Sequence, residues 1–191
     1  MRTFIALTSR RIVALPVLGA ICALAVAMAP PALAGSACQS ASALPTETTK
    51  PAVVRATLCT INAERSRKGL ADLRLNRRLA AAAGAHATDM DARNYFAHDS
   101  LDGASFLDRI RRAGYLSGAR SWKAGENLAW GSRGRSSPAT ITQMWMNSPP
   151  HRANILNSAF REIGIGVSYG APVSGQRAPA ATYATSFGAR G

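Results

Sequence analysis

Apolar positions recur with a helical period along the first half of the chain. In residues 53–68, Val54, Leu58 and Ile61 fall near one face of a helix, and Gly69 follows as a stop. The same reasoning predicts a short amphipathic helix over residues 105–113 and a helix that opens with a proline over residues 138–146. A final helical turn is predicted over residues 151–156. A largely helical first part of the domain follows from these segments.

The segment from Arg77 to about Tyr95 is predicted to be a further helix, with Asn76 as its N-cap. Its apolar face has spacings of three and four and consists of Leu79, Ala82, Ala83, His86 and Met90. The many alanines indicate close packing against a neighbouring element. We therefore favour His86 as a core histidine that is hydrogen-bonded to a neighbour, over a role as a ligand.

Near the C-terminus the period changes to two. Ile163, Ile165 and Val167 alternate with small residues, and residues 182–187 alternate again. Prolines and a glycine lie between them, so we expect an antiparallel hairpin with a long loop. Helices followed by an antiparallel pair predict an α+β domain. Residues 118–122 and 132–137 are interpreted as loops, the second of them flexible.

The first 34 residues have the pattern of a signal peptide. Three arginines and no acid accompany an apolar run from Ile12 to Ala29, and Ala34 ends a small-x-small cleavage pattern. A retained membrane anchor is the alternative, but a spanning helix needs about 20 apolar residues and Pro16 interrupts this run. We therefore expect cleavage after Ala34, a secreted (extracellular or periplasmic) protein and no transmembrane segment in the mature chain.

The mature chain keeps two cysteines, Cys38 and Cys59. An even pair in an exported chain predicts a disulfide, with two unpaired cysteines as the alternative. The bridge would tie the extension of residues 35–52, which contains Ser, Thr and Pro, to the first helix.

Composition and charge narrow the function classes. The chain is 47% apolar and 17% charged, which argues against general disorder, and no phosphate-binding glycine motif is present. Cleavage removes three arginines and no acid, which lowers the formal charge from +13 to +10. Nucleic acid, anionic lipid and anionic envelope polymer all attract such a protein. Because the basic residues form no stripe with interleaved aromatics, we do not expect a nucleic-acid partner.

Candidate chemistry rests on His98, Glu126 and His151. Glu126 lies in apolar surroundings, where an unpaired carboxylate is costly. Two histidines and one glutamate can form a zinc site with an open position, and a carboxylate beside an imidazole can be an acid–base pair. The spacing H-E-x-x-H is absent from the sequence, and no catalytic residue is assigned.

The motifs around these residues resemble those of bacterial, secreted members of the CAP superfamily, which takes in cysteine-rich secretory proteins, antigen 5 and plant pathogenesis-related proteins. The resemblance covers residues 53–188. It rests on His86-Ala87-Thr88-Asp89-Met90, Tyr95-Phe96-Ala97-His98, Gly114-Tyr115, Gly125-Glu126-Asn127-Leu128-Ala129, Trp145-Met146-Asn147-Ser148-Pro149-Pro150-His151-Arg152-Ala153-Asn154-Ile155-Leu156 and Ile163-Gly164-Ile165-Gly166-Val167.

The resemblance implies an α–β–α sandwich, with a small antiparallel sheet between helical layers. It also implies a cleft lined by two histidines and two acidic residues. His98, Glu126 and His151 fall on three of these positions, but Ser148 stands where the family has its second acid. This departure weakens any mechanism that needs two carboxylates.

Our leading functional hypothesis is a secreted, non-enzymatic module, expected to be monomeric, that binds a small or lipid-like ligand. Zn²⁺ is a candidate at His98 and His151, with Glu126 as a third ligand or as a residue that orients a ring. One alternative is a metal-assisted hydrolase that acts on envelope or extracellular material. Another is an adhesion-type module held to anionic envelope polymers by its charge.

Overall fold

The computed structural model describes residues 38–191, so the predicted signal peptide lies outside the described residues. In chain order the elements are η1 (Pro45–Glu47), α1 (Lys50–Ser66), β1 (Arg74–Leu75), α2 (Arg77–Arg93), α3 (Phe106–Arg112), β2 (Trp122–Ser132), η2 (Arg133–Ser136), α4 (Pro138–Asn147), α5 (Pro149–Ile155), β3 (Glu162–Ser168) and β4 (Ala180–Arg190). Among these residues, none of the helices has the length and hydropathy to cross a membrane.

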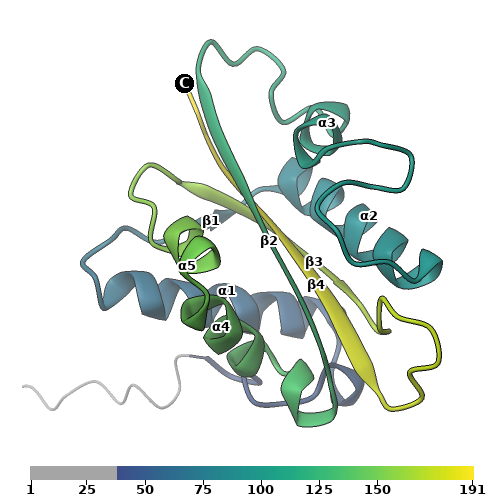
Figure 1. Cartoon of the computed structure of the whole chain (residues 1–191). Coiled ribbons are helices and arrows are strands. Elements are labelled where there is room, and N and C mark those ends of the chain that lie inside the picture. The colour runs from purple at the N-terminus through teal and green to yellow at the C-terminus, as the bar shows by residue number, and fades with distance from the viewer. Residues whose placement is uncertain (1–37) are drawn as a thin grey trace, which may run out of the picture. The chain divides into compact units, whose positions relative to one another are not determined.

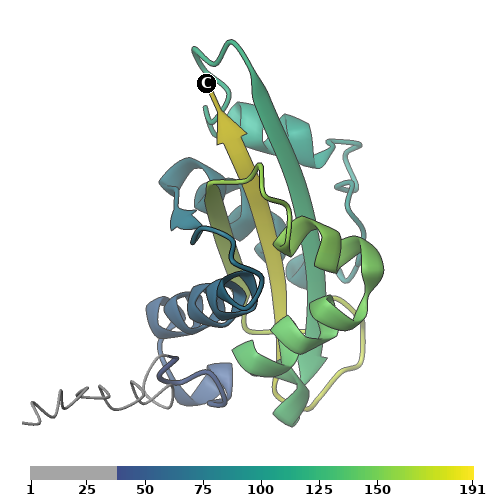
Figure 2. The ribbon, with the colours of Figure 1, turned by 90° about the vertical axis from the view of Figure 1, so that its left-hand side faces the viewer.

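One four-stranded sheet, in the order β1-β3-β4-β2, forms the middle layer. The helices α2 and α3 lie on one side of it, and α1, α4 and α5 lie on the other (Figures 1 and 2). The predicted hairpin is confirmed, because β3 and β4 pair antiparallel. β2 also pairs antiparallel with β4, whereas the short β1 runs parallel to β3. The α+β sandwich is therefore present, with a mixed sheet in place of a wholly antiparallel one.

The predicted close packing of the alanine-rich helix is confirmed by its contact with β3. A Cβ atom added at Gly164 would lie 2.0 Å from the backbone of Leu79, and one at Gly166 would lie 2.3 Å from that of Ala83. The two glycines thus let the backbones of β3 and α2 approach closely. The Asn76 side chain accepts hydrogen bonds from the backbone N–H groups of Arg78 and Leu79 in the first turn of α2, as expected of its N-cap. This packing fixes the helix that carries His86.

The larger part of the core lies under α1, α4 and α5. It includes Val53, Ile61, Ile141, Trp145 and Ile155, all of which are buried against β3 and β4. The indole N–H of Trp145 donates to the backbone oxygen of Leu128 on β2, at 3.0 Å. Helix α4 is therefore fixed both by apolar packing and by a directional bond to the strand that carries Glu126.

The predicted disulfide between Cys38 and Cys59 is confirmed, with a Cα–Cα distance of 5.4 Å. It joins the start of the described chain to α1. A second link holds the same segment, because the backbone N–H of Ala139 donates to the backbone oxygen of Ala41 at 2.9 Å. Helix α1 begins at Lys50 instead of residue 53, since Thr49 caps it and Pro51 suits its first turn. Much of the extension is therefore packed against the domain.

The loop predicted over residues 118–122 is confirmed for residues 118–121. The strand β2 begins at Trp122 and was missed, because its residues from Gly125 to Ala129 are buried on both faces and show no alternation. Residues 132–137, predicted to be flexible, contain η2, in which Ser136 is buried. The hydroxyl of Tyr183 donates to the backbone oxygen of Ser136 at 2.8 Å, which fixes this turn against β4.

Candidate functional site

The centre of the site is a buried carboxylate that holds an exposed histidine. Glu126 lies on β2, and His98 lies in the segment that connects α2 to α3. The Nδ1 atom of His98 is 2.9 Å from Oε1 of Glu126. The side chain of Glu126 is 2% exposed, whereas that of His98 is 55% exposed. The fold thus brings together two residues that are far apart in sequence, as the resemblance implied.

Arg109 on α3 neutralises this carboxylate. Its Nη2 atom donates to Oε2 of Glu126 at 2.8 Å and to Oε1 at 3.1 Å. The same nitrogen donates to the backbone oxygen of His98 at 2.7 Å, so Arg109 also fixes the segment that carries the imidazole. The pair meets the expectation that a carboxylate in apolar surroundings needs a partner. The sequence analysis did not identify Arg109, which lies within the run Arg109-Ile110-Arg111-Arg112 and resembles surface charge.

The hydrogen bond to Glu126 determines which ring nitrogen of His98 is available. A carboxylate only accepts, so Nδ1 carries the proton and Nε2 is the nitrogen left for a ligand. The same hydrogen bond raises the pKa of His98 above its ordinary value of 6.5, although partial burial opposes this. His98 is therefore oriented, exposed and more readily protonated than an isolated histidine.

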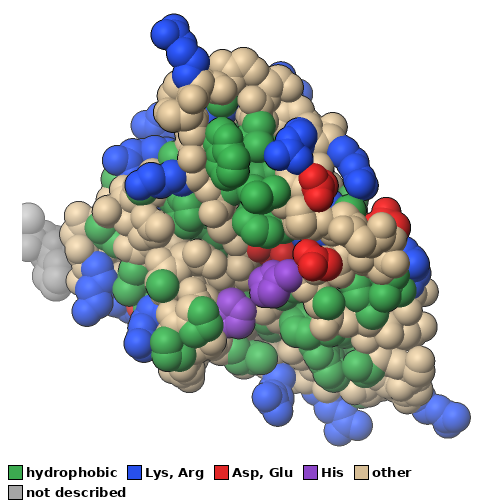
Figure 3. All heavy atoms as spheres, turned by 45° about the horizontal axis from the view of Figure 1, so that its top comes forward, with side chains coloured by type: hydrophobic (Ala, Val, Ile, Leu, Met, Phe, Trp, Pro, Cys, Tyr) green, Lys and Arg blue, Asp and Glu red, His purple; other side chains and the backbone are tan. Residues whose placement is uncertain are grey.

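His151 is the second histidine of the site and lies in the first turn of α5, directly after Pro149 and Pro150. The prolines thus begin the helix that carries it. Burial, followed by the positive charge of His98, lowers the pKa of His151 below 6.5. The two imidazoles are thus close enough to interact electrostatically. Figure 3 shows histidine side chains next to each other on one face, with acidic side chains beside them.

Two asparagines attach α5 to β2 and thereby place His151 relative to Glu126. The amide of Asn127 donates to the backbone oxygen of His151 at 3.0 Å. The amide of Asn154 donates to the backbone oxygen of Glu126 at 3.1 Å and to the side-chain oxygen of Asn127 at 2.9 Å. Both residues belong to the motifs of the family resemblance, but the sequence analysis assigned them no role.

Ser148, the fourth expected cleft residue, lies at the junction of α4 and α5. Its backbone N–H donates to Trp145 and its backbone oxygen accepts from Arg152, which joins the two helices. Ser148 lies three positions before His151, at the start of the helix that carries it. Ser148 is partly exposed, so a longer acidic side chain can be introduced at this position.

The site offers few ligands to a metal ion. Within residues 38–191, no group of three or more His, Cys, Asp and Glu side chains is arranged to hold a metal ion. Both oxygens of Glu126 are engaged, by Arg109 and by His98. Glu126 therefore fits the role of a carboxylate that orients a ligating imidazole better than that of a ligand. The residues present offer a metal two imidazoles, His98 and His151.

The two histidines should titrate in a defined order. We expect the midpoint of His98 above pH 6.5 and that of His151 below it, because Glu126 favours the charged form of His98 while burial and the charge of His98 disfavour that of His151. The stability that His98 contributes is then complete below its unfolded pKa of about 6.5, and it is lost as the pH rises through its raised folded pKa. NMR titration of the ring Hε1 signals measures both midpoints, and the reverse order would contradict this electrostatic picture.

The family model described as CAP, the cysteine-rich secretory protein family, matches residues 58–184. The chain belongs to this family. The CAP domain of the chain is 41% identical over 106 residues to the protein named "Uncharacterized protein YkwD" of Bacillus subtilis (strain 168), covering 55% of this chain and 38% of that protein. This chain thus spans about two fifths of the length of that relative.

Solved structures show the same CAP fold. An extracellular protein containing an SCP domain from Bacillus anthracis is 28% identical, with a TM-score of 0.55 over 73% of this chain and 43% of that chain. An outer surface protein from Borrelia burgdorferi has a TM-score of 0.59 over 75% of this chain and 96% of that chain, and its 21% identity shows a common fold alone.

Proposed function

We propose that this CAP-domain protein is a secreted ligand-binding module whose binding residues are His98 and His151. The observation that carries the proposal is the buried pair of Arg109 and Glu126, which holds the exposed imidazole of His98 in one orientation. Burying an ion pair costs desolvation free energy. A buried pair that orients an exposed ring therefore serves ligand recognition more directly than it serves packing. In its charged form the ring donates a hydrogen bond from Nε2, and in its neutral form Nε2 accepts one or binds a metal.

Two exposed apolar side chains near His98 in the sequence support a small or lipid-like ligand. Phe96 is 45% exposed and Leu101 is 56% exposed, and both belong to the segment that carries His98. A ligand with a polar head could contact the imidazoles while its apolar part covers these two side chains. The chemistry of this surface therefore favours an amphipathic molecule over a uniformly charged polymer.

Two findings support export. The bridge between Cys38 and Cys59 is typical of an oxidising compartment, and the related Bacillus anthracis protein is described as extracellular. We therefore place the mature chain, after cleavage behind Ala34, outside the cytoplasm.

Zn²⁺ should bind weakly at His98 and His151, because it meets two imidazoles and because Arg109 neutralises the nearby carboxylate. A variant with both His98→Ala and His151→Ala should lose the binding, whereas Ser148→Glu should strengthen it by adding a carboxylate. Calorimetric titration with Zn²⁺ compares the three proteins, and circular dichroism checks that each is folded. Equal binding by the wild type and the double variant would exclude zinc at this site.

A metal-assisted hydrolase is the second candidate, and the contact between His98 and Glu126 favours it. An imidazole oriented by a buried carboxylate has the arrangement of a general base. Turnover of a peptide or envelope substrate that a chelator abolishes, and that Glu126→Gln also abolishes, would favour the enzyme. Binding without turnover would favour the ligand-binding module.

A further inference from the structure

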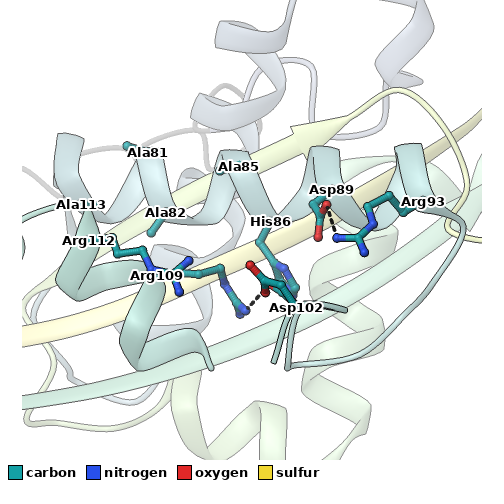
Figure 4. A pocket seen from close by; sticks show the side chains of 11 residues that line it. Ala81, Ala82, Ala85, His86, Asp89, Arg93, Asp102, Arg109, Arg112 and Ala113 are labelled. Atoms are coloured by element: carbon teal, nitrogen blue, oxygen red, sulfur yellow. Dashed lines mark hydrogen bonds and ion pairs between the residues drawn. The ribbon is translucent and has the colours of Figure 1, made fainter. Parts of the chain in front are cut away.

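A hollow lined by neither His98 nor His151 lies between α2 and α3. It has a volume of about 400 Å³. Its walls carry the methyl groups of Ala81, Ala82 and Ala85 on α2 and of Ala113 just after α3 (Figure 4). Small side chains on both helices thus leave a space with apolar walls.

His86 lines this pocket and has one ring nitrogen without a partner. The residue is 1% exposed, which confirms its prediction as a core histidine. Its Nε2 atom is 2.9 Å from the backbone oxygen of Ala97. Among the side chains of residues 38–191, the Nδ1 atom of His86 is the one buried polar atom that lacks a hydrogen-bond partner. A buried polar atom without a partner costs about 1–3 kcal/mol, so its presence beside a hollow needs an explanation.

The bond to Ala97 fixes the chemistry of this nitrogen. A backbone carbonyl only accepts, so the proton lies on Nε2. Burial, together with the charge of Arg109, lowers the pKa of His86 and favours the neutral ring. In that ring Nδ1 is an acceptor with a free lone pair. This buried acceptor therefore lacks a donor, and the residue that carries it lines the pocket.

The two acidic side chains of the pocket already have partners. Asp89 accepts from the hydroxyl of Tyr95 and pairs with Arg93, and Asp102 accepts from the backbone of Ala104. Figure 4 shows Asp89 facing Arg93 on α2, away from the Arg109 end of the pocket.

Arg109 is likewise engaged. Its Nη1 atom donates to the hydroxyl of Ser100 at 3.1 Å and to the backbone oxygen of Ala104 at 3.0 Å, while Nη2 bonds Glu126. A guanidinium so engaged has little left to offer an anionic ligand.

The charges around the pocket disfavour a cationic ligand. Arg93, Arg109 and Arg112 outnumber Asp89 and Asp102 among the lining residues, so an ammonium group meets net repulsion. A carboxylate ligand has no proton to give to Nδ1. An uncharged hydroxyl group meets neither objection.

We propose that the pocket between α2 and α3 is a second binding site, which takes a small uncharged alcohol with a compact apolar body. The hydroxyl donates to Nδ1 of His86, and the body contacts the alanine methyl groups. The site uses neither His98 nor His151, so it does not depend on the function proposed for them.

Benzyl alcohol is a suitable probe, with benzyl methyl ether as a control that has the same ring and no donor. NMR on the full mature protein follows the ¹⁵N signal of His86 Nδ1 and the methyl signals of Ala82, Ala85 and Ala113. Benzyl alcohol should shift these signals saturably and move Nδ1 in the direction of an accepted hydrogen bond. The ether should bind about five- to tenfold more weakly, as the loss of one hydrogen bond predicts.

A variant in which a larger side chain fills the pocket tests where benzyl alcohol binds. Ala85 is exposed on α2 and lines the pocket, so Ala85→Leu should abolish the benzyl alcohol response while the protein stays folded. Thr88 is exposed on the same helix outside the lining, so Thr88→Leu should leave the response unchanged. No saturable shift at any soluble concentration, equal binding of alcohol and ether, or full binding by Ala85→Leu would each overturn the proposal and leave the pocket to water.

Discussion

Replacing Arg109 with methionine should destabilise the protein by about 3–5 kcal/mol, the range found when one partner of a buried ion pair is removed. The side chains of Arg109 and Glu126 are 9% and 2% exposed, so the variant would leave a carboxylate in the interior without its counter-charge. It would also lose the bonds from Arg109 to the backbone oxygens of His98 and Ala104. Urea denaturation monitored by circular dichroism measures the free energy of unfolding.

Two companion variants isolate the cause. Arg111 lies on the same helix with its side chain 60% exposed, and it pairs with Asp108 at the surface. Arg111→Met should therefore cost about 1 kcal/mol or less. Adding Glu126→Gln to Arg109→Met should recover part of the lost stability, because it removes the uncompensated charge. If Arg109→Met is as stable as Arg111→Met, the pair is not buried in solution as it is here.

The case of Arg109 shows where sequence reasoning reached its limit. The carboxylate of Glu126 was predicted to need a partner, yet the partner comes from α3, which is 17 positions away along the chain and on a different element. Four consecutive positions, from Arg109 to Arg112, hold three arginines. The helical period distinguishes their faces only when the neighbouring elements are known. The need for a partner could thus be predicted from chemistry, but its identity required the tertiary structure.

Elements with strong local determinants were predicted well. The cap at Asn76, the proline that opens α4 and the alternation in β3 each depend on residues close together in sequence. The strand β2 lacks such a local pattern, because its central residues are buried between two helical layers. The two-residue strand β1 is too short to show any period, and it forms only through its pairing with β3.

For the site, residue chemistry and family resemblance contributed differently. Chemistry alone identified His98, Glu126 and His151 as unusual residues, but their distances along the chain contain no information about contact. The order of motifs implied one cleft, and the structure gives the bond between His98 and Glu126 together with the asparagine bonds that attach α5 to β2. The prediction that His86 is a core residue was correct. Its unpartnered Nδ1 atom could be identified only from the structure, in which the other ring nitrogen bonds to Ala97.

Removing the disulfide should cost about 3 kcal/mol of stability, because the bridge closes a loop of intermediate length in the unfolded chain. Cys38 and Cys59 are 21 positions apart, and the bridge holds the start of the described chain on α1. The variant with both Cys38→Ser and Cys59→Ser should show this loss in urea denaturation. Local disorder should be limited to the segment before α1, since Ala41 keeps its backbone bond to α4.

Reductant provides the matched control for this prediction. Dithiothreitol should lower the stability of the wild type to that of the double variant, and it should leave the double variant unchanged, because the disulfide is its target and the double variant has none. Intact-mass analysis of protein from the culture medium tests the premise: the mature chain should begin at Gly35 and be two hydrogens lighter than its reduced form. A wild type that is indifferent to reductant, or that is secreted with two free thiols, would contradict a structural role for the bridge and would leave the extension held by α4 alone.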